Sequence, residues 1–354
     1  MSHYHSLRMA EVRPETREAI TVTFDIPSPL AEAFRFTPGQ HVNVRADVAG
    51  QEVRRSYSIC AAASQQLRIL IKRQPGGLFS NWANDQLHTG GVLDVMPPTG
   101  LFHLPKAAIP GARYLAIAAG SGITPVLSIL KSSLAADPHC EWTLFYGNRA
   151  SSTILFREEL ADLKDRYLER FSLVHVMSRE EQDLDLLNGR LTPDRCLELL
   201  RHWGPLQGLE AVFLCGPHEM NREVADALLV AGYPAARIKR EQFATSRQQQ
   251  TLAPLPPAGE NAVCQAQLIL DGRTHQFPVR QRETILDAGL RAGIDLRFSC
   301  KGGVCATCRA KLVSGEVDMD GNFALEDYEI ARGYILTCQS YPVSPALVVD
   351  FDQD

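Results

Sequence analysis

Residues 298–308, FSCKGGVCATC, and residues 336–339, LTCQ, decide how the last quarter of this 354-residue chain folds. Together they give the spacing C-x4-C-x2-C-x29-C, at positions Cys300, Cys305, Cys308 and Cys338. Four thiolates at this spacing can hold two iron ions bridged by two sulfides. Gly302 and Gly303 suit a backbone that wraps closely around such a cluster and points N–H groups at its sulfur atoms. We therefore expect these four cysteines to bind a 2Fe-2S cluster.

A structural zinc site and a set of reduced core cysteines are the alternatives for the same residues. Zinc sites usually pair their ligands as two short knuckles, whereas here three cysteines share one loop and the fourth stands alone. The other five cysteines are scattered, and nine in 354 residues are too few for a disulfide scaffold. With this loop, residues 262–354 resemble the plant-type ferredoxin domain. The resemblance implies a β-grasp fold in which the four cysteines are the cluster ligands.

Length and composition limit the class of protein. The chain is longer than the roughly 100–200 residues of a typical domain, so two or three domains are expected. It is 45% hydrophobic and 22% charged, which excludes a disordered chain, a fibre and a coiled coil. A net charge of −5 gives no electrostatic reason to expect nucleic-acid binding. The charged N-terminal stretch and the lack of a long uncharged apolar segment predict a cytoplasmic protein without a membrane partner.

Three changes in residue pattern divide the chain. Residues 1–106 contain short apolar or β-branched runs between Gly- and Pro-rich turns, which predicts an antiparallel β-barrel. Residues 107–243 alternate apolar strands with helical periodicity, which predicts βαβ units and a doubly wound parallel sheet. Residues 244–261 contain prolines and three consecutive glutamines, and we interpret them as a semi-stiff linker. Residues 262–354, with nine basic and thirteen acidic residues, are a distinct acidic domain that begins with a predicted hairpin and a short helix.

Two stretches of the first domain carry groups that suit a flavin. They are RRSYS at 54–58, at the end of a predicted strand, and GGLFS at 76–80, after a strand that ends in Lys72. A flavin needs an aromatic or apolar wall, a hydroxyl near its N5 atom, and cations with backbone N–H groups for its phosphates. The candidate flavin-binding residues are Arg55, Ser56, Tyr57, Ser58, Lys72, Gly76, Gly77, Phe79 and Ser80. Taken alone, R-x-Y-S is also typical of an exposed strand end.

The string GSGITP at 120–125 lies between the apolar strand YLAIAA and a predicted helix. Gly120 and Gly122 let a pyrophosphate approach the backbone at a helix N-terminus, where free N–H groups and the helix dipole favour anions. Because the string is not G-x-G-x-x-G, it indicates a dinucleotide site only weakly by itself. A plain helix-capping turn is the alternative.

The order of the motifs is more specific than any one of them. R-x-Y-S, G-G-x-x-S, G-S-G-I-T-P, Y-G-N-R and C-G-P follow one another as in the ferredoxin-reductase family, in which a flavin barrel precedes a pyridine-nucleotide domain. With its ferredoxin-like end, the whole chain is similar to the reductase components of bacterial phenylacetyl-CoA epoxidase systems. The strings that carry this likeness are RRSYSIC, AIAAGSGITP, YGNR, FLCGP, CKGGVCATC and LTCQ.

The resemblance implies FAD as the flavin and a role for each matching residue. Arg55 and Ser80 would hold flavin phosphates, Tyr57 would stack near the ring, and Ser58 would face N5. The nicotinamide would lie beside four residues, Thr124, Cys215, Gly216 and Pro217. Glu241 and Phe243 match an acidic and aromatic pair near the flavin, although Gln242 stands where the family usually has Arg. The resulting candidates for catalytic residues are Ser58, Cys215 and Glu241.

Residue chemistry favours NADPH over NADH. Arg149 follows one predicted strand, and Ser178 and Arg179 follow the next, at carboxyl ends where the adenosine part of a dinucleotide binds. Two guanidinium groups suit a 2′-phosphate, whereas an NAD site would place Asp or Glu there. Either arginine is equally consistent with a solvated surface charge.

These expectations combine into one function, in which electrons pass from NADPH through FAD and the 2Fe-2S cluster to a multisubunit di-iron oxygenase, the phenylacetyl-CoA epoxidase. The alternatives are a reductase for an aromatic-ring dioxygenase or another oxygenase, with FMN possible there in place of FAD, and a non-catalytic electron carrier or redox sensor. A run of acidic residues between the third and fourth cysteines suggests a surface that steers docking onto a basic partner, with a solvated loop as the alternative. It comprises Glu316, Asp318, Asp320, Glu326, Asp327 and Glu329.

Overall fold

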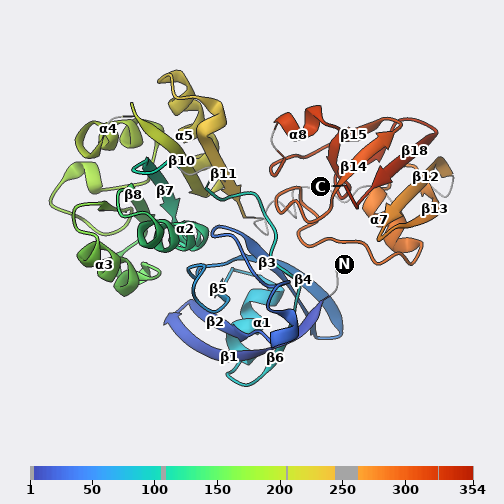
Figure 1. Cartoon of the computed structure of the whole chain (residues 1–354), viewed down its shortest axis with the longest axis horizontal. Helices are drawn as coiled ribbons and strands as arrows, with labels where there is room; N and C mark the ends of the chain where they lie inside the picture. Colours follow the sequence, from blue (N-terminus) through green and yellow to red (C-terminus); the bar gives the residue numbers. More distant parts are fainter. Residues whose placement is uncertain (1–3, 105–108, 205, 244–261, 326, 354) are drawn as a thin grey trace. The chain divides into compact units, whose positions relative to one another are not determined.

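The computed structural model describes residues 4–104, 109–204, 206–243, 262–325 and 327–353. They form two compact units, one made of residues 4–53 and 57–243, and another made of residues 54–56 and the described residues from 262 onward. Figure 1 shows the elements of both, coloured along the chain. The expected linker, residues 244–261, and the expected boundary between the first two domains, at 106 and 107, lie outside the described residues.

The first part of the chain forms a six-stranded sheet in the order β4-β3-β6-β1-β2-β5. Its strands are β1 (His5–Thr16), β2 (Ala19–Asp25), β3 (His41–Val48), β4 (Gln51–Ser58), β5 (Arg68–Lys72) and β6 (Val92–Val95). The pairs β1–β2, β1–β6, β2–β5 and β3–β6 are antiparallel. An antiparallel bridge between Ile59 and Ile69 joins the chain just after β4 to β5, which closes the sheet into the predicted barrel.

One helix of this barrel domain was not foreseen from the sequence. Helix α1 (Leu78–Gln86) starts directly after the glycine pair Gly76 and Gly77. Gly76 has a φ of +70°, a left-handed conformation that glycine adopts without steric cost. Phe79 and Ala83 of α1 are buried in the barrel core, so the helix packs onto the barrel through an apolar face. The sequence does not show this face clearly, because polar residues stand between its apolar ones.

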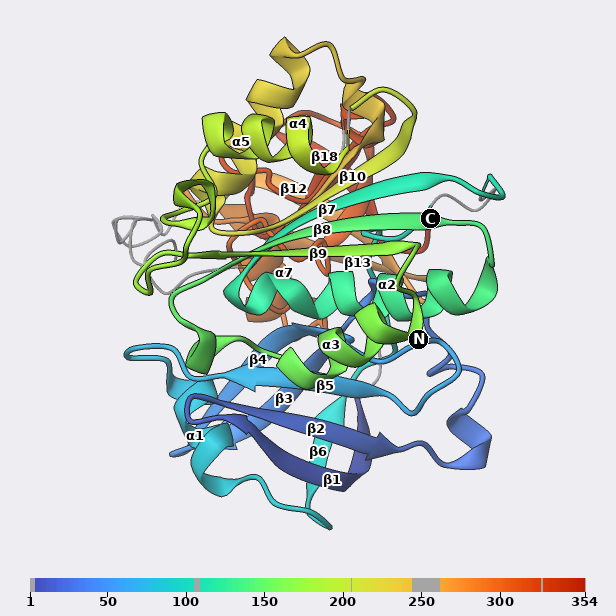
Figure 2. The same ribbon diagram turned by 90° about the vertical axis from the view of Figure 1, so that its left-hand side faces the viewer.

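The middle of the chain forms the predicted parallel sheet, in the order β11-β10-β7-β8-β9. Its strands are β7 (Arg113–Ala119), β8 (Glu141–Asn148), β9 (Phe171–Met177), β10 (Leu209–Gly216) and β11 (Ile238–Gln242), and its helices are α2 (Ile123–Ala136), α3 (Arg157–Arg166), α4 (Pro193–Trp203) and α5 (His218–Val230). Figure 2 shows α2 and α3 between this sheet and the barrel, with α4 and α5 on the opposite face. The central strands β7 and β10 are buried along most of their length, as expected for strands covered on both faces.

Helix α4 and strand β11 complete this domain, and neither was identified from the sequence. The α4 signals are present in retrospect: the Thr192 hydroxyl accepts a hydrogen bond from the Arg195 N–H at 3.4 Å, and Pro193 occupies the first turn. Strand β11 is only five residues long and largely polar, so its sequence lacks the apolar run that marks the other strands.

The last part of the chain is a β-grasp domain around a five-stranded sheet in the order β13-β12-β18-β14-β16. The strands are β12 (Ala262–Leu270), β13 (Arg273–Arg280), β14 (Arg309–Ser314), β16 (Tyr334–Leu336) and β18 (Ala346–Asp350), with a separate pair β15 (Val317–Met319) and β17 (Ser340–Pro342). Helices α7 (Ile285–Arg291) and α8 (Asp327–Ala331) accompany them. Asp271 and Gly272, both with positive φ, connect β12 to β13 in the predicted hairpin, because tight turns of this kind favour Asp-Gly.

Membrane insertion by helices finds no support in the described ranges, where no helix combines the length and apolar character needed to cross a bilayer.

Candidate functional site

Ser58, Cys215 and Glu241 come together where the barrel meets the carboxyl edge of the parallel sheet. Ser58 is the last residue of β4 in the barrel, and Cys215 and Glu241 lie opposite each other on the neighbouring strands β10 and β11. The Ser58 hydroxyl donates a hydrogen bond to the Glu241 carboxylate, with 3.3 Å between the oxygen atoms. The three candidate catalytic residues are therefore neighbours in the folded chain.

Burial sets the protonation of this cluster. Desolvation raises the pKa of Glu241 to about 8, and the hydrogen bond from Ser58 opposes part of this increase. Burial, with a smaller effect of the nearby Glu241 carboxylate, raises the pKa of Cys215 well above its usual value. The Cys215 side chain is completely buried and stays a neutral thiol, so it acts as an apolar surface and not as a nucleophile. Glu241 is the group that can hold or release a proton near pH 8.

The glycine-rich string before α2 lies directly beside this cluster. A Cβ atom at Gly122 would come within 1.9 Å of the Cys215 carbonyl oxygen, so only glycine fits there. Gly120, with a φ of +54°, begins the turn into α2, and the buried Thr124 hydroxyl donates to the Ser121 carbonyl at 2.9 Å. The N-terminus of α2 therefore lies at the carboxyl edge of the sheet, just after β7, which is the position where dinucleotides bind in doubly wound folds.

Three polar side chains of this region were not identified from the sequence. His41, at the start of β3, places Nδ1 4.0 Å from a carboxylate oxygen of Glu241. The Asn221 amide donates to the backbone carbonyls of Glu241 at 2.9 Å and Gly216 at 3.4 Å, which ties α5 to the ends of two strands. The Tyr146 hydroxyl donates to the Gly120 carbonyl at 3.0 Å. His41 and Asn221 belong to none of the motifs quoted above, because each reaches the site through the fold of a distant segment, whereas Tyr146 is the first residue of the YGNR string that ends in Arg149.

The other members of the nicotinamide set follow the same edge. Gly216 ends β10, and Pro217 precedes the first residue of α5. A Cβ atom at Gly216 would lie 2.5 Å from the end of the Met220 side chain and 3.1 Å from the Ala119 side chain, so a larger residue here would have to displace Met220. Phe243, just beyond β11, is partly buried against the core that the sheet shares with α2.

The flavin candidates lie on three neighbouring segments of the barrel domain. Arg55, Ser56 and Tyr57 lie half-buried along β4, and Lys72 ends β5. The Ser80 hydroxyl accepts the Gln74 N–H at 3.1 Å, which closes the turn at Gly76 and Gly77. The first-turn N–H groups of α1 have no partner within the helix, and a helix N-terminus after a glycine turn suits a phosphate.

The aromatic side chains near Tyr57 divide into a surface and a support. The Phe79 ring is buried in the barrel core, 5.8 Å from the ring of Tyr57 and 5.5 Å from that of Trp82. Phe79 therefore packs against Tyr57 from the core side, and its own ring is not accessible from solvent. Tyr57, which is half-buried, is the aromatic side chain that remains accessible on β4.

The candidate adenosine-binding residues are adjacent and exposed. Arg149 follows β8, Ser178 and Arg179 follow β9, and the Arg179 N–H donates to the Arg149 carbonyl at 2.8 Å. Burial lowers the pKa of Lys72, and the guanidinium of Arg149 lowers it further, so positive charges from the barrel and from the sheet lie near each other. The Glu180 carboxylate, which no sequence motif indicated, accepts hydrogen bonds from the Ser151 N–H at 2.7 Å and the Ser151 hydroxyl at 2.8 Å.

The cysteine loop of the last domain has the backbone that a metal–sulfur cluster requires. Lys301, Gly303 and Ala306 all have positive φ, at 50°, 74° and 51°, so the loop turns sharply between its cysteines. A Cβ atom at Gly303 would lie 2.6 Å from the Gly321 carbonyl oxygen. The Gly302 N–H donates to the Cys300 sulfur at 3.3 Å, and the Gln339 amide to the Cys338 sulfur at 3.8 Å.

The four thiols are buried and close enough to affect one another. A hydrogen bond with Cys305 is the main reason that the pKa of Cys300 is raised. A hydrogen bond between Cys308 and Cys338 raises the pKa of Cys308 and lowers that of Cys338. The thiols thus lie in two pairs, Cys300 with Cys305 and Cys308 with Cys338, with an N–H group directed at one sulfur of each pair, and two pairs of thiolates fit the two irons of a 2Fe-2S cluster.

The acidic run between Cys308 and Cys338 is only partly a surface feature. Glu316, Asp318 and Asp320 are exposed, but Glu329 is 1% exposed and forms an ion pair with Arg309 at 2.9 Å. Glu326 lies outside the described residues. Glu329 therefore does not belong to a solvent-facing acidic surface, because α8 turns its carboxylate toward the residue that follows Cys308.

Family models match all three parts of the chain. An oxidoreductase FAD-binding domain matches residues 6–104, an oxidoreductase NAD-binding domain matches residues 116–226, and a 2Fe-2S iron-sulfur cluster binding domain matches residues 268–343. A solved structure titled phthalate dioxygenase reductase, 24% identical, covers 98% of each chain with a TM-score of 0.58 and supports the fold. The chain is thus an oxidoreductase that combines FAD, a nicotinamide nucleotide and a 2Fe-2S cluster.

Proteins of similar sequence show which kind of oxidoreductase this is. The chain is 42% identical to one of the subunits of 1,2-phenylacetyl-CoA epoxidase from Escherichia coli (strain K12), over 99% of each chain. It is 33% identical to the ferredoxin reductase component of 3-ketosteroid-9-alpha-monooxygenase of Rhodococcus rhodochrous, over 98% of this chain and 96% of that one. The chain belongs to this family of reductase components of oxygenases.

Proposed function

We propose that this protein is the reductase of a phenylacetyl-CoA epoxidase system and passes electrons from NADPH to a multisubunit di-iron oxygenase. The observation that supports it most strongly is the 42% identity to a component of the Escherichia coli epoxidase over 99% of both chains. The convergence of Ser58, Cys215 and Glu241 at the end of a parallel sheet supports the first step. The cysteine loop supports the last step.

Four segments of the chain divide this work. We propose residues 1–106 as the flavin-binding domain, 107–243 as the NADP-binding domain, 244–261 as a linker and 262–354 as the ferredoxin domain. The ranges of the family models, which run from 6 to 104, from 116 to 226 and from 268 to 343, are consistent with these limits.

FAD accepts two electrons together as a hydride and gives them up singly, which lets a one-electron 2Fe-2S cluster follow a nicotinamide donor. Ser58 would place its hydroxyl beside the flavin, and Glu241 would hold that hydroxyl in position. Cys215 and Thr124, both buried and small, would leave a narrow apolar site that excludes water from the nicotinamide ring. Glu241 would hold or release the proton that accompanies electron transfer.

The phosphate groups would be held by charge and by helix ends. The first turn of α1, with Gly76, Gly77, Ser80 and Arg55, would bind the flavin phosphates, while Lys72 adds a positive charge near by. Gly120, Gly122 and the N-terminus of α2 would bind the nucleotide pyrophosphate. Arg149, Ser178 and Arg179 would bind the 2′-phosphate, which makes NADPH the preferred donor.

Cys300, Cys305, Cys308 and Cys338 would be the cluster ligands, and the N–H groups directed at their sulfur atoms would favour the negative charge of the reduced cluster. The oxygenase is the acceptor in this scheme. Relatives of this chain serve a steroid monooxygenase and a glycine betaine monooxygenase by name, so the acceptor is the part of the proposal that most needs a direct test.

Reconstitution tests the acceptor. The purified protein, loaded with FAD and cluster, is mixed with the oxygenase components of a phenylacetyl-CoA epoxidase, NADPH and phenylacetyl-CoA, and epoxide formation is measured against NADPH consumed. We expect tightly coupled product formation. Oxygenase components of an aromatic-ring dioxygenase serve as the comparison. Efficient coupling with the dioxygenase and none with the epoxidase would overturn the proposed acceptor, and no NADPH oxidation with either would overturn the reductase itself.

A further inference from the structure

Helix α2 carries hydroxyl groups at a spacing of four residues. Thr124, Ser128 and Ser132 therefore lie on one face of the helix, one turn apart. Thr124 lies at the end of the helix that the proposed function places beside the nicotinamide. Ser128 and Ser132 are not part of any motif and have no role in the site described above.

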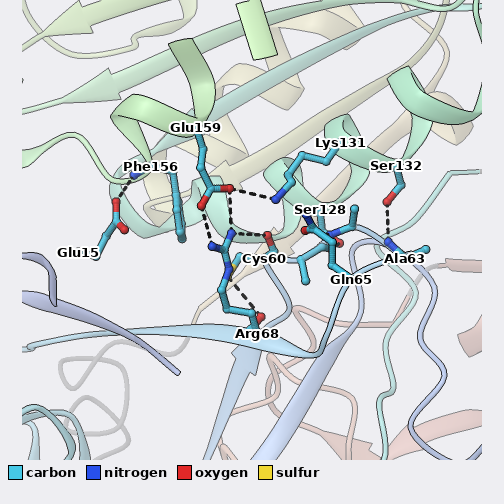
Figure 3. Close-up of polar contacts among 12 residues, drawn as sticks. Glu15, Cys60, Ala63, Gln65, Arg68, Ser128, Lys131, Ser132, Phe156 and Glu159 are labelled. Atoms are coloured by element: carbon cyan, nitrogen blue, oxygen red, sulfur yellow. Dashed lines mark hydrogen bonds and ion pairs between the residues drawn. The ribbon is translucent and has the colours of Figure 1, made fainter. Parts of the chain in front are cut away.

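Both serines form hydrogen bonds with the backbone of the barrel domain. The Ser128 hydroxyl donates to the Ala61 carbonyl at 2.6 Å. The Ser132 hydroxyl accepts the Ala63 N–H at 3.0 Å (Figure 3). Ser128 is completely buried, and Ala61 is 1% exposed. Ala61 lies three residues after Ser58, the residue proposed to face the flavin. The hydrogen bond therefore joins the segment that follows Ser58 to helix α2, at whose start Thr124 is proposed to lie beside the nicotinamide.

A partly buried ion-pair network also connects the barrel to α2 and α3. Arg68 of β5 binds both oxygens of the Glu159 carboxylate, at 2.7 and 2.9 Å, and Lys131 of α2 binds the same carboxylate at 3.0 Å (Figure 3). Arg68 also donates to the Cys60 carbonyl at 3.4 Å, one residue before Ala61. The segment 60–63 is thus attached to α2 through Ser128 and Ser132 and, through Arg68, to the Glu159 carboxylate of α3.

The geometry points to Ser128 as a positioning residue for hydride transfer, which sets the separation between Ser58 in the barrel and Thr124 on α2 through its bond to Ala61. This role rests on the proposed function of those two residues. Hydride transfer is sensitive to small displacements, because an error of about 1 Å in the position of reacting groups can cost on the order of a hundredfold in rate. Without the Ser128 hydroxyl, the buried Ala61 carbonyl has lost a donor and the barrel segment can shift relative to α2.

Helix α2 provides a matched control. Ser133 is also a buried serine, but its hydroxyl donates to the Ile129 carbonyl of the same helix at 2.8 Å and accepts the Trp142 indole N–H at 2.9 Å. Ser133→Ala removes the same hydroxyl from the same helix without touching a contact to the barrel. Any general weakening of α2 therefore affects both variants.

The test is anaerobic stopped-flow reduction of the FAD-loaded full chain by NADPH, in wild type, Ser128→Ala, Ser128→Thr and Ser133→Ala. We expect Ser128→Ala to lower the limiting rate of flavin reduction about tenfold or more, with the dissociation constant for NADPH within about twofold of wild type. Ser128→Thr should recover most of the rate, and Ser133→Ala should stay within about twofold. A second readout is amide hydrogen exchange of residues 59–63, which should increase in Ser128→Ala alone.

A Ser128→Ala rate within about twofold of wild type, or an equal fall in Ser133→Ala, would overturn the inference. If Ser128→Ala fails to fold, Ser132→Ala, half-buried one turn further along the same face, replaces it and should show a smaller fall in the same limiting rate. Failure of the proposed function would look different, since wild type itself would then not be reduced by NADPH.

Discussion

The Ser58 hydroxyl and the Glu241 carboxylate lie 3.3 Å apart, although 183 positions separate them along the chain. Ser58 ends a barrel strand, and Glu241 lies on the edge strand of the parallel sheet. Neither domain holds both members of the pair, so the site is complete only when barrel and sheet are packed together. The hydrogen bonds from Ser128 and Ser132 of α2 to the barrel also hold these two domains together.

We predict that Glu241 makes stability depend on pH. Burial raises its pKa to about 8 in the folded chain, from about 4.5 in the unfolded chain, so folding binds a proton between these values. The free energy of unfolding that this group contributes is fully present below about pH 4.5 and is lost as the pH rises through about 8. Compared with Glu241→Gln, wild type should therefore lose up to about 1.4 kcal/mol of unfolding free energy per pH unit in this range. Urea unfolding from pH 5 to 8.5 measures it.

The exposed Glu158→Gln variant is the control for the pH series. Glu158 lies on α3 and faces solvent, so its unfolding free energy should follow that of wild type at every pH. If the difference between wild type and Glu241→Gln stayed constant across the series, Glu241 would not be a buried proton-binding group.

Arg149→Ala should change the choice of nucleotide. Loss of a charge-assisted contact to the 2′-phosphate removes about 1.5–3 kcal/mol of binding, which raises KM for NADPH and leaves KM for NADH nearly unchanged. Steady-state reduction of ferricyanide with each nucleotide measures both constants. Arg166→Ala, an exposed arginine in the last turn of α3, should affect neither. Equal increases in both constants for Arg149→Ala would remove the 2′-phosphate role.

The sequence predicted the features that local chemistry controls. The barrel and the parallel sheet follow from apolar runs and glycine turns, and the 2Fe-2S cluster follows from a cysteine spacing, whereas the β-grasp fold and FAD were implied by the resemblance to known families. Helix α4 and strand β11 were not predicted. Helix α4 has an amphipathic sequence between two loops, and strand β11 is short and polar. Glu329 was misplaced because a run of acidic residues gives no sign of which carboxylate α8 turns inward.

Contacts between distant segments could not be predicted. His41, Asn221 and Ser128 are ordinary polar residues in the sequence, and their partners lie in other segments of the fold. A contact of this kind depends on how two distant segments pack, between domains for His41 and Ser128 and within the sheet domain for Asn221, which no periodicity or motif encodes.

Cys308→Ser should separate the two halves of electron transfer. With one cluster ligand lost, the visible absorbance of the 2Fe-2S cluster and the NADPH-driven reduction of cytochrome c should disappear, while NADPH still bleaches the flavin. Cys264→Ser is the matched control, because Cys264 is a buried cysteine of β12 in the same domain and outside the cluster motif. Loss of flavin reduction in Cys308→Ser would contradict independent roles for the domains.

The ion pair between Arg309 and Glu329 predicts a change in the reduction potential of the cluster. Arg309 follows Cys308, which we propose as a cluster ligand. Its guanidinium lies 3.7 Å from the centre of the Tyr334 ring, and its partner Glu329 is 1% exposed. In Glu329→Gln the guanidinium keeps its charge but loses the compensating carboxylate. Because the cluster becomes more negative when it is reduced, an added positive charge near Cys308 should move the potential to a more positive value. Removal of one partner of a buried pair should also cost up to about 3 kcal/mol of stability.

A redox titration followed by cluster absorbance measures this shift in the full chain. Glu329→Asp keeps the charge and should restore most of the potential, whereas Glu316→Gln removes an exposed carboxylate that solvent and salt already screen and should shift it far less. Thermal unfolding of the same proteins separates the electrostatic effect from simple loss of structure, since Glu329→Asp and Glu329→Gln both disturb packing but only the second changes the charge. A potential that stays constant or becomes more negative in Glu329→Gln would show that the Arg309 charge does not reach the cluster.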